Sequence, residues 1–198
     1  FVYPKSIRST ENGIRRYLIG EKKLPSVTSI LDATKSEEDK AALANWVERT
    51  GLKESEAIVK AASNRGSKMH AYLESFLLGQ QNLSFFDDNE QYKLMAKEII
   101  EKGLINRFEE VWGVECTLYK PDSYSGTCDA VGVYDGRESI IDFKQSNKPK
   151  KFEYIDSWLL QTAAYSLAHN TVYNSNITAC VIPVSYTHLR AHETGGYR

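Results

Sequence analysis

The sequence predicts an α/β (α+β) fold in which a helical N-terminal half precedes a mixed β-sheet flanked by helices. Through most of residues 1–112, apolar residues recur at the three- and four-residue spacing of helices. From residue 113 onward, short segments alternate with a period of two, which is typical of strands. The chain has 198 residues, of which 41% are hydrophobic, enough for one compact core. We therefore expect a single domain over residues 1–183, with an arm and helical half at 1–112 and a sheet-containing core at 113–183.

The first stretch of the chain carries polar, turn-forming residues. Residues 1–23 predict an irregular arm or a short hairpin. The arm also contains a basic cluster to which the sequence assigns no role, made of Arg15, Arg16, Lys22 and Lys23. In the next segment, LPSVTSIL, apolar residues follow Ser26 at helical spacing, which predicts a helix that Ser26 caps.

Three longer segments predict further helices. Apolar residues repeat at helical intervals in Glu37–Val47, Glu54–Leu78 and Asn89–Trp112, and the first two begin with acidic residues that favour a helix N-terminus. Trp46, in the first of them, is interpreted as a core residue rather than a platform for stacking bases.

The second half of the chain predicts a sheet with one crossover helix. Three strands are expected at Val114–Tyr119, Thr127–Tyr134 and Glu138–Lys144, with an Asp-Gly pair marking a tight hairpin between the last two. Phe152–His169 returns to helical spacing, and Ile177–Pro183 predicts a buried strand. The expected order is β-β-β-α-β.

Composition narrows the class of protein. No apolar stretch approaches the roughly 20 residues that span a bilayer, and the first residues have neither the layout of a signal peptide nor an initiator Met. Cys116, Cys128 and Cys180 are scattered and odd in number, which predicts neither a disulfide framework nor a zinc or iron–sulfur site. A net charge of −1 argues against coating nucleic acid through bulk charge but leaves room for a local basic groove. We expect a soluble, intracellular protein in a reducing compartment, with its N-terminus processed or missing.

The last fifteen residues differ in character from the rest. Val184–Thr194 resembles the conceptual translation of a sequencing-library adapter, so residues 184–198 are interpreted as a non-native tail. Within the tail, His188 and His192 have the i, i+4 spacing of metal ligands on one helix face. We set that interpretation aside because of the predicted foreign origin.

The strongest chemical pattern is SGTCDAVGVYDGRESIIDFKQS. Asp142 and Lys144 are two residues apart, so both side chains point to one face of a strand while Phe143 points into the core. Across the hairpin, Asp129 can approach Asp142. Two close carboxylates repel each other unless a cation neutralises them, and carboxylate oxygens suit Mg²⁺. Beside such a metal, the Lys144 ammonium could orient an attacking water or offset charge on phosphorus.

Other interpretations of this pattern stay open. An Asp-x-Lys pair on a strand is also typical of an exposed, salt-bridged face. The context favours the catalytic interpretation, because Gly126 precedes Asp129 by three residues and an apolar Ile140–Ile141 pair leads into Asp142. Glu115, just before the hairpin, is either a neighbour of the metal site or a solvent-facing strand residue, and we favour the second.

Several landmarks occur in the order of a known family: LPSVTSIL, RGSKMHAYLE, VECTLY, GTCDA, IIDFK and QTAAY. Over roughly Leu24 to Pro183, the chain resembles the exonuclease branch of the PD-(D/E)XK superfamily, which includes RecB-like and mitochondrial genome maintenance exonuclease-like nucleases. The resemblance implies a restriction-endonuclease-like core, with the helical half forming a wall or arch over the site.

The resemblance also implies roles for individual residues. Asp129, Asp142 and Lys144 are the implied catalytic residues. The implied metal ligands are His70, Asp129, Asp142 and the backbone carbonyl of Phe143. Without the resemblance, a lone His on a helix is more often a surface or core residue.

Further residues have implied supporting roles with open alternatives. Glu74 either orients His70 or lies on a solvated helix face, and Gln161 and Tyr165 either position a phosphate or pack a helix over the sheet. A basic segment follows the Asp-x-Lys pair and either lines the path of the DNA or is simply solvated; its members are Lys148, Lys150 and Lys151.

Taken together, the resemblance implies a metal-dependent exonuclease that hydrolyses phosphodiester bonds of single-stranded or end-exposed DNA in replication, recombination or repair. Its implied cofactor is Mg²⁺, with Mn²⁺ as a substitute and no iron–sulfur cluster. The sequence has no GxxxxGK[ST] loop, so a helicase or recombination partner would be a separate polypeptide. Two alternatives are a structure-selective endonuclease and a catalytically inactive DNA-binding module. We expect no membrane partner and a place in the cytoplasm of a bacterial or phage-infected cell.

Overall fold

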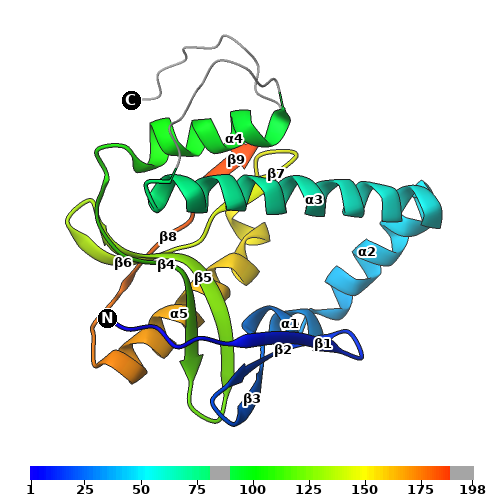
Figure 1. Cartoon of the computed structure of the whole chain (residues 1–198). Helices are drawn as coiled ribbons and strands as arrows, with labels where there is room; N and C mark the ends of the chain where they lie inside the picture. The colour runs from blue at the N-terminus through cyan, green and yellow to red at the C-terminus, as the bar shows by residue number, and fades with distance from the viewer. Residues whose placement is uncertain (81–89, 188–198) are drawn as a thin grey trace.

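The computed structural model describes residues 1–80 and 90–187 and confirms the predicted mixed α/β architecture (Figure 1). Its main sheet has the strand order β4-β5-β6-β8. The strands β4 (Phe108–Lys120), β5 (Tyr124–Tyr134) and β6 (Arg137–Ile141) pair antiparallel, and β8 (Ala179–Val181) pairs parallel with β6. A parallel strand needs a crossover connection, which the predicted helix between β6 and β8 supplies.

Helices cover both faces of this sheet (Figure 1). On one face, Ala130 and Ile141 pack with residues of α3 (Leu52–Leu77), α4 (Gln91–Ile99) and the π-helical turn η1 (Ile100–Leu104). On the other face, Val131 and Ile140 pack with α5 (Asp156–Tyr173) and α1 (Val27–Ala33). Successive strand residues therefore serve two separate cores, as the alternation of a doubly covered sheet requires.

The N-terminal arm is more regular than predicted. It forms a three-stranded antiparallel sheet of β1 (Ile7–Glu11), β2 (Ile14–Ile19) and β3 (Lys22–Pro25). Asn12 and Gly13 both have positive φ, which makes the tight β1–β2 turn. Ser26 then caps α1 by accepting a hydrogen bond from the Ser29 N–H at 3.0 Å, which confirms the predicted cap.

Helix α2 (Glu37–Thr50) begins after Ser36, whose side chain accepts from the Asp39 N–H at 3.1 Å. No residue of α2 is fully buried, and Trp46 is half-buried. The interpretation of Trp46 as a core residue is therefore wrong, because α2 packs against α3 rather than against the sheet.

The predicted helix Asn89–Trp112 is too long. Asn89 lies outside the described residues, α4 and η1 end at Leu104, and β4 already begins at Phe108. Phe108 and Val111 fit a helical repeat, but they pair with Tyr134 and Gly132 of β5. Pairing across the sheet overrides the local pattern here.

The hairpin predicted at the Asp-Gly pair is confirmed. Asp135 (φ +46°) and Gly136 (φ +71°) both adopt the left-handed conformation that this turn requires, and β5 pairs with β6 on either side. The strand predicted at Ile177–Pro183 is shorter, since β8 holds only Ala179–Val181.

After β6 the sheet continues as a separate pair of short strands. The strands β7 (Lys144–Ser146) and β9 (Val184–Tyr186) pair parallel. Strand β9 lies within the segment interpreted as a non-native tail, and the origin of that segment stays a prediction. His188 and His192 lie outside the described residues. Over residues 1–80 and 90–187, no helix combines the length and apolar character needed to cross a bilayer.

Candidate active site

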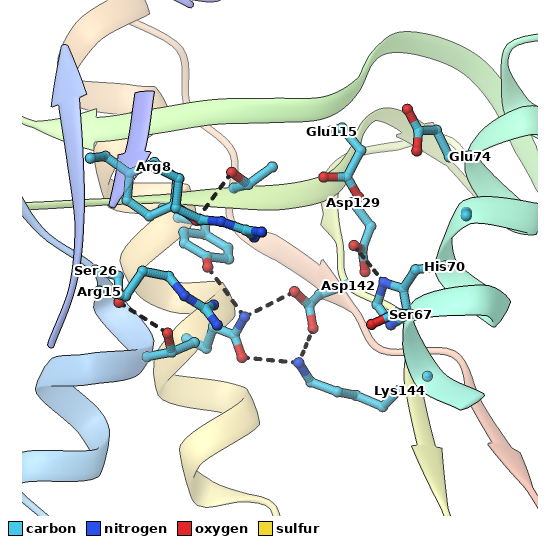
Figure 2. A pocket seen from close by; sticks show the side chains of 18 residues that line it. Arg8, Arg15, Ser26, Ser67, His70, Glu74, Glu115, Asp129, Asp142 and Lys144 are labelled. Atoms are coloured by element: carbon cyan, nitrogen blue, oxygen red, sulfur yellow. Dashed lines mark hydrogen bonds and ion pairs between the residues drawn. The ribbon is translucent and has the colours of Figure 1, made fainter. Parts of the chain in front are cut away.

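A pocket of about 490 Å³ opens between the N-terminal sheet, α3, β5 and α5. Figure 2 shows the side chains that line it. The pocket collects the implied catalytic and supporting residues that are far apart in sequence: His70, Glu74, Asp129, Asp142, Lys144, Gln161 and Tyr165. Four separate elements therefore converge on one place.

His70 and Asp129 link α3 to β5. Met69 and Leu73 of α3 are fully buried against the sheet, and this packing fixes the rotation of the helix so that His70 faces the pocket. His70 Nδ1 lies 2.9 Å from Asp129 Oδ1. The other carboxylate oxygen of Asp129 accepts a hydrogen bond from the Phe143 N–H at 2.5 Å. Asp129 is thus held from two sides.

Asp142 and Lys144 lie where the sheet passes from β6 to β7. The Asp142 N–H donates to the Val181 carbonyl at 3.1 Å, and the Lys144 N–H donates to the Pro183 carbonyl at 3.0 Å. Strand geometry therefore continues through both residues, and their side chains form an ion pair. Phe143 between them is 1% exposed. The predicted shared face of Asp142 and Lys144, and the inward direction of Phe143, are confirmed.

Gln161 of α5 connects these two charged groups. Its Nε2 donates to Asp142 Oδ1 at 3.1 Å and to the Tyr165 hydroxyl at 3.2 Å, and its Oε1 accepts from Lys144 Nζ at 3.0 Å. Tyr165 is buried against Gly126, where a Cβ atom would lie only 2.7 Å from the tyrosine ring. Gln161 therefore positions charged groups, while Tyr165 both packs and accepts a hydrogen bond.

Glu115 lies at the site, although the sequence favours a solvent-facing position over that of a neighbour of the metal site. Its ligand atom lies within 4.8 Å of those of His70 and Asp129, so the three form a cluster able to hold a metal ion. Its φ of +49° is in the left-handed region, which is uncommon for a non-glycine residue and frequent at functional sites. Glu115 is exposed to solvent, as the favoured interpretation expects, and it also lines the pocket, as the alternative of a neighbour of the metal site expects. A period-two pattern cannot reveal such a local twist of the strand.

The site concentrates negative charge in a partly buried space. Burial, together with the charges of Asp129 and Glu74, raises the pKa of Glu115 to about 7. Burial and the charge of Asp129 also raise the pKa of Asp142, against the opposing effect of Lys144. Burial lowers the pKa of His70, but the hydrogen bond and charge of Asp129 outweigh it, so that pKa is raised. A bound cation would relieve this excess of negative charge.

The donor set of the pocket fits a divalent cation. One imidazole nitrogen and two carboxylates form the cluster of His70, Glu115 and Asp129, a donor set that divalent metals accept. Nearby, the buried carboxylate of Asp142 is paired through Oδ2 with the Lys144 ammonium. The predicted ligand roles of Asp142 and of the Phe143 carbonyl stay predictions, because the cluster includes Glu115 in place of both.

The three lysines implied in DNA binding are not part of this pocket. Lys148, Lys150 and Lys151 line a neighbouring one. Glu74 lines the active-site pocket beside Glu115 but is not a member of the ligand cluster.

Two arginines of the N-terminal sheet line the pocket and were not assigned from the sequence. Arg8 of β1 pairs with Tyr17 of β2, and Arg15 stands two residues before Tyr17, so all three share one face of the sheet. Figure 2 shows Arg8 and Arg15 extending toward the carboxylates from the opposite wall. The basic cluster predicted in the arm is therefore divided, with Arg15 in the pocket and Arg16 on the other face of β2.

This geometry agrees with the similarity of the chain to known proteins. The chain is 31% identical to mitochondrial genome maintenance exonuclease 1 of Homo sapiens over 176 residues, which cover 82% of this chain and 49% of that protein. It is 31% identical to the protein of the same name from Mus musculus over 173 residues, which cover 82% of this chain and 50% of that protein. The chain is similar to a family of exonucleases. It spans about half the length of the curated relatives that it matches.

The similarity extends to a third relative at lower identity. The protein of the same name from Xenopus tropicalis is 27% identical over 175 residues, which cover 82% of this chain and 48% of that protein. No family model matches the chain. The chain is thus similar to these exonucleases over most of its own length and about half of theirs.

Proposed function

We propose that the chain is a metal-dependent DNA exonuclease of the PD-(D/E)XK superfamily, which hydrolyses phosphodiester bonds of single-stranded or end-exposed DNA. The observation that carries the proposal is the cluster of His70, Glu115 and Asp129 beside the linked side chains of Asp142, Gln161 and Lys144. Metal-type ligands and a cationic amine lie in one pocket. Such a pairing suits the hydrolysis of a phosphate ester.

His70, Glu115 and Asp129 would hold the metal, with Asp142 next to them. A bound Mg²⁺ or Mn²⁺ ion supplies a Lewis acid that polarises the phosphate and favours formation of hydroxide. We favour Mg²⁺ because carboxylate oxygens dominate the donor set, and the imidazole makes Mn²⁺ a good substitute.

The other residues act through position and charge. The Lys144 ammonium is fixed by Gln161 and Asp142 and lines the pocket, where its remaining N–H can orient a water or stabilise charge on the phosphate oxygens. Arg8 and Arg15, on the opposite wall, would neutralise phosphates of the bound strand. Binding of the anionic substrate is thus opposed by the carboxylates and favoured by the arginines and the metal.

A digestion assay with single strands labelled at either end, alongside a closed circular strand, tests the proposal. In the presence of Mg²⁺ we expect stepwise loss of nucleotides from linear DNA and an intact circle. Cleavage of the circle would instead identify a structure-selective endonuclease.

A matched pair of variants tests whether the pocket does the chemistry. Asp142→Asn should abolish cleavage, whereas Asp122→Asn, which removes an exposed carboxylate paired with Lys22, should leave it unchanged. Binding of DNA without cleavage by the unmodified chain would identify an inactive DNA-binding module. Full activity of Asp142→Asn would remove this residue from the catalytic site.

A further inference from the structure

A second pocket, of about 640 Å³, borders the active-site pocket. Both pockets are lined by α3, by the chain around β7 and by α5. In each of these elements, residues close together in sequence serve different pockets: Gly66, Lys144 and Gln161 line the active-site pocket, and Arg65, Gln145 and Trp158 line the second. The two pockets are therefore consecutive parts of one surface.

Gln145 lies where residues of the two pockets meet. Gln145 Nε2 donates to the Ala62 carbonyl at 2.5 Å, and Arg65 Nε donates to Gln145 Oε1 at 2.7 Å. A Cβ atom at Gly66 would lie 2.7 Å from Gln145 Nε2, so a side chain at this position would displace the Gln145 amide. Gln145, which lines the second pocket, thus lies against Gly66, which lines the active-site pocket, so the two pockets are adjacent.

The second pocket is rich in positive charge. Arg65, Lys148, Lys150 and Lys151 line it, and no carboxylate occurs among the described residues of its lining. Arg65 donates to amide oxygens of Gln145 and Asn147, which are neutral partners that leave its charge uncompensated by those bonds. The chemistry of this pocket complements an anionic ligand, in contrast to the carboxylate-rich active-site pocket.

Aromatic rings accompany these cations. Tyr154 lines the pocket and is 63% exposed, and Trp158 lines it while half-buried. Cations that follow a phosphate backbone, next to rings on which bases stack, are the two features of a site for single-stranded nucleic acid.

We propose that this basic aromatic pocket, formed by Arg65, Lys148, Lys150, Tyr154 and Trp158, binds one or two unpaired nucleotides of the DNA strand that continues from the scissile phosphate. Its volume lies in the range of about 300 to 1,000 Å³ that encloses small ligands rather than a double helix. A base must leave its duplex to stack on a protein ring, so the pocket selects a single strand. The inference rests on the proposed nuclease function, because it names the substrate of the same site.

Two kinds of variant separate the roles of charge and stacking. Tyr154→Ala should weaken binding of a fluorescent ten-nucleotide single strand roughly fivefold or more, without changing the dependence of affinity on salt. Lys148→Ala with Lys150→Ala should weaken binding and also reduce the slope of log affinity against log salt concentration, because each lysine that binds a phosphate releases counterions. Fluorescence anisotropy with Ca²⁺ in place of Mg²⁺ measures both without turnover.

Three controls separate binding in the second pocket from general effects of charge and folding. Lys40→Ala with Lys102→Ala removes the same charge from surfaces outside both pockets and should leave binding unchanged. Hydrolysis of bis(p-nitrophenyl) phosphate, which is too small to reach the second pocket, should be equal in Lys40→Ala with Lys102→Ala and in the unmodified chain. Binding of a blunt duplex should not respond to Tyr154→Ala.

Unchanged single-strand affinity in both the Tyr154 and the lysine variants would overturn the inference, as would equal losses for single strand and duplex. The same holds if the unmodified chain does not bind the single strand. Absence of cleavage by a chain that still binds through Tyr154 would instead contradict the proposed nuclease function and leave the nucleotide-binding pocket supported.

Discussion

Gln161 Nε2 donates a hydrogen bond to Asp142 Oδ1 at 3.1 Å, so a helix on one face of the sheet fixes a carboxylate in the active-site pocket. The same amide accepts a hydrogen bond from Lys144. Because an amide has one donor side and one acceptor side, it can hold a carboxylate and an ammonium at the same time. This single residue therefore sets the relative position of the two charged groups of the Asp-x-Lys pair.

Replacement of Gln161 by Ala should lower kcat for DNA cleavage roughly tenfold to a hundredfold, as is usual when a residue that orients a metal-site group is removed. KM should change much less, because Gln161 orients Asp142 and Lys144 rather than binding the strand. Steady-state kinetics on a labelled single strand provide the measurement. Gln91→Ala, which removes a surface hydrogen bond to the Thr187 carbonyl, is the control and should match the unmodified chain. A change confined to KM would contradict this role.

Glu115 should make metal binding depend on pH. Its pKa of about 7 means that the carboxylate needed by a metal forms only as pH rises through neutrality. We expect Mn²⁺ affinity, measured by calorimetry, to rise between pH 6 and 8 in the unmodified chain. In Glu115→Gln the affinity should be lower and its rise in this range smaller. Equal pH profiles for the two proteins would remove Glu115 from the ligand set.

The same shift predicts an effect on stability without metal. The folded pKa of Glu115 lies above its ordinary value, so the folded chain binds this proton more tightly than the unfolded chain does. Its contribution to stability is present below pH 4.5 and is lost as pH rises through 7. Metal-free Glu115→Gln should therefore melt at a higher temperature than the unmodified chain at pH 8, and added Mn²⁺ should stabilise it less.

Local sequence patterns predict much of this fold for clear physical reasons. Some features depend only on a few neighbouring residues, so the sequence alone predicts them. They are the Ser26 cap, the Asp135–Gly136 hairpin and the shared face of Asp142 and Lys144. The helical prediction over Phe108–Trp112 was wrong because the competing interaction is with β5, more than twenty residues away. Pairing with a distant strand does not change the local spacing of apolar residues, so that spacing cannot predict it.

The candidate active site also combines residues that the sequence predicts with residues that only the fold brings together. Motifs predict His70 and Gln161, whereas the sequence gives Glu115 only as an alternative and assigns no role to Arg8 or Arg15. The turn of Glu115 into the pocket depends on one backbone angle in the left-handed region, which no sequence pattern encodes. Arg8 and Arg15 reach the pocket only because the N-terminal strands pair with each other and lie against the start of α1 and the tip of β5.

Arg8 and Arg15 should contribute to substrate binding. Replacing both by Ala should raise KM for single-stranded DNA and reduce the slope of log affinity against log salt concentration by about one for each phosphate that is no longer neutralised. The effect on kcat should be smaller, because neither guanidinium belongs to the Asp142–Gln161–Lys144 group.

Arg16→Ala is the matched control for these two residues. Arg16 stands next to Arg15 on β2 but faces the other side of the sheet and does not line the pocket. It should leave both KM and the salt dependence unchanged. If Arg16→Ala weakened binding as much as the double variant does, the arginines would act through general charge rather than through the pocket.

His169, which does not line the active-site pocket, should make the stability of the fold depend on pH. Its ring is fully buried, with Nδ1 2.7 Å from the Ser175 hydroxyl and Nε2 3.2 Å from the Tyr3 hydroxyl. Burial, with the charge of the nearby N-terminal ammonium, lowers the pKa of His169 to about 4. The unfolded chain then binds this proton more tightly than the folded chain between pH 6.5 and 4. The contribution of His169 to the free energy of unfolding is therefore fully present above pH 6.5. It is lost as pH falls toward 4, by at most about 3 kcal/mol.

Urea unfolding at pH 7.0, 6.0 and 5.0 measures this dependence, and His169→Asn isolates it. The Asn amide keeps a polar group near Ser175 but has no proton to bind in this range. The variant should be less stable at pH 7 because it fills less of the core, yet its stability should fall less steeply between pH 7 and 5. The carboxylates titrate alike in both proteins, so the difference between their slopes of unfolding free energy against pH is due to the titration of His169. Parallel slopes would show that the buried imidazole takes up its proton without unfolding the aromatic cluster around it.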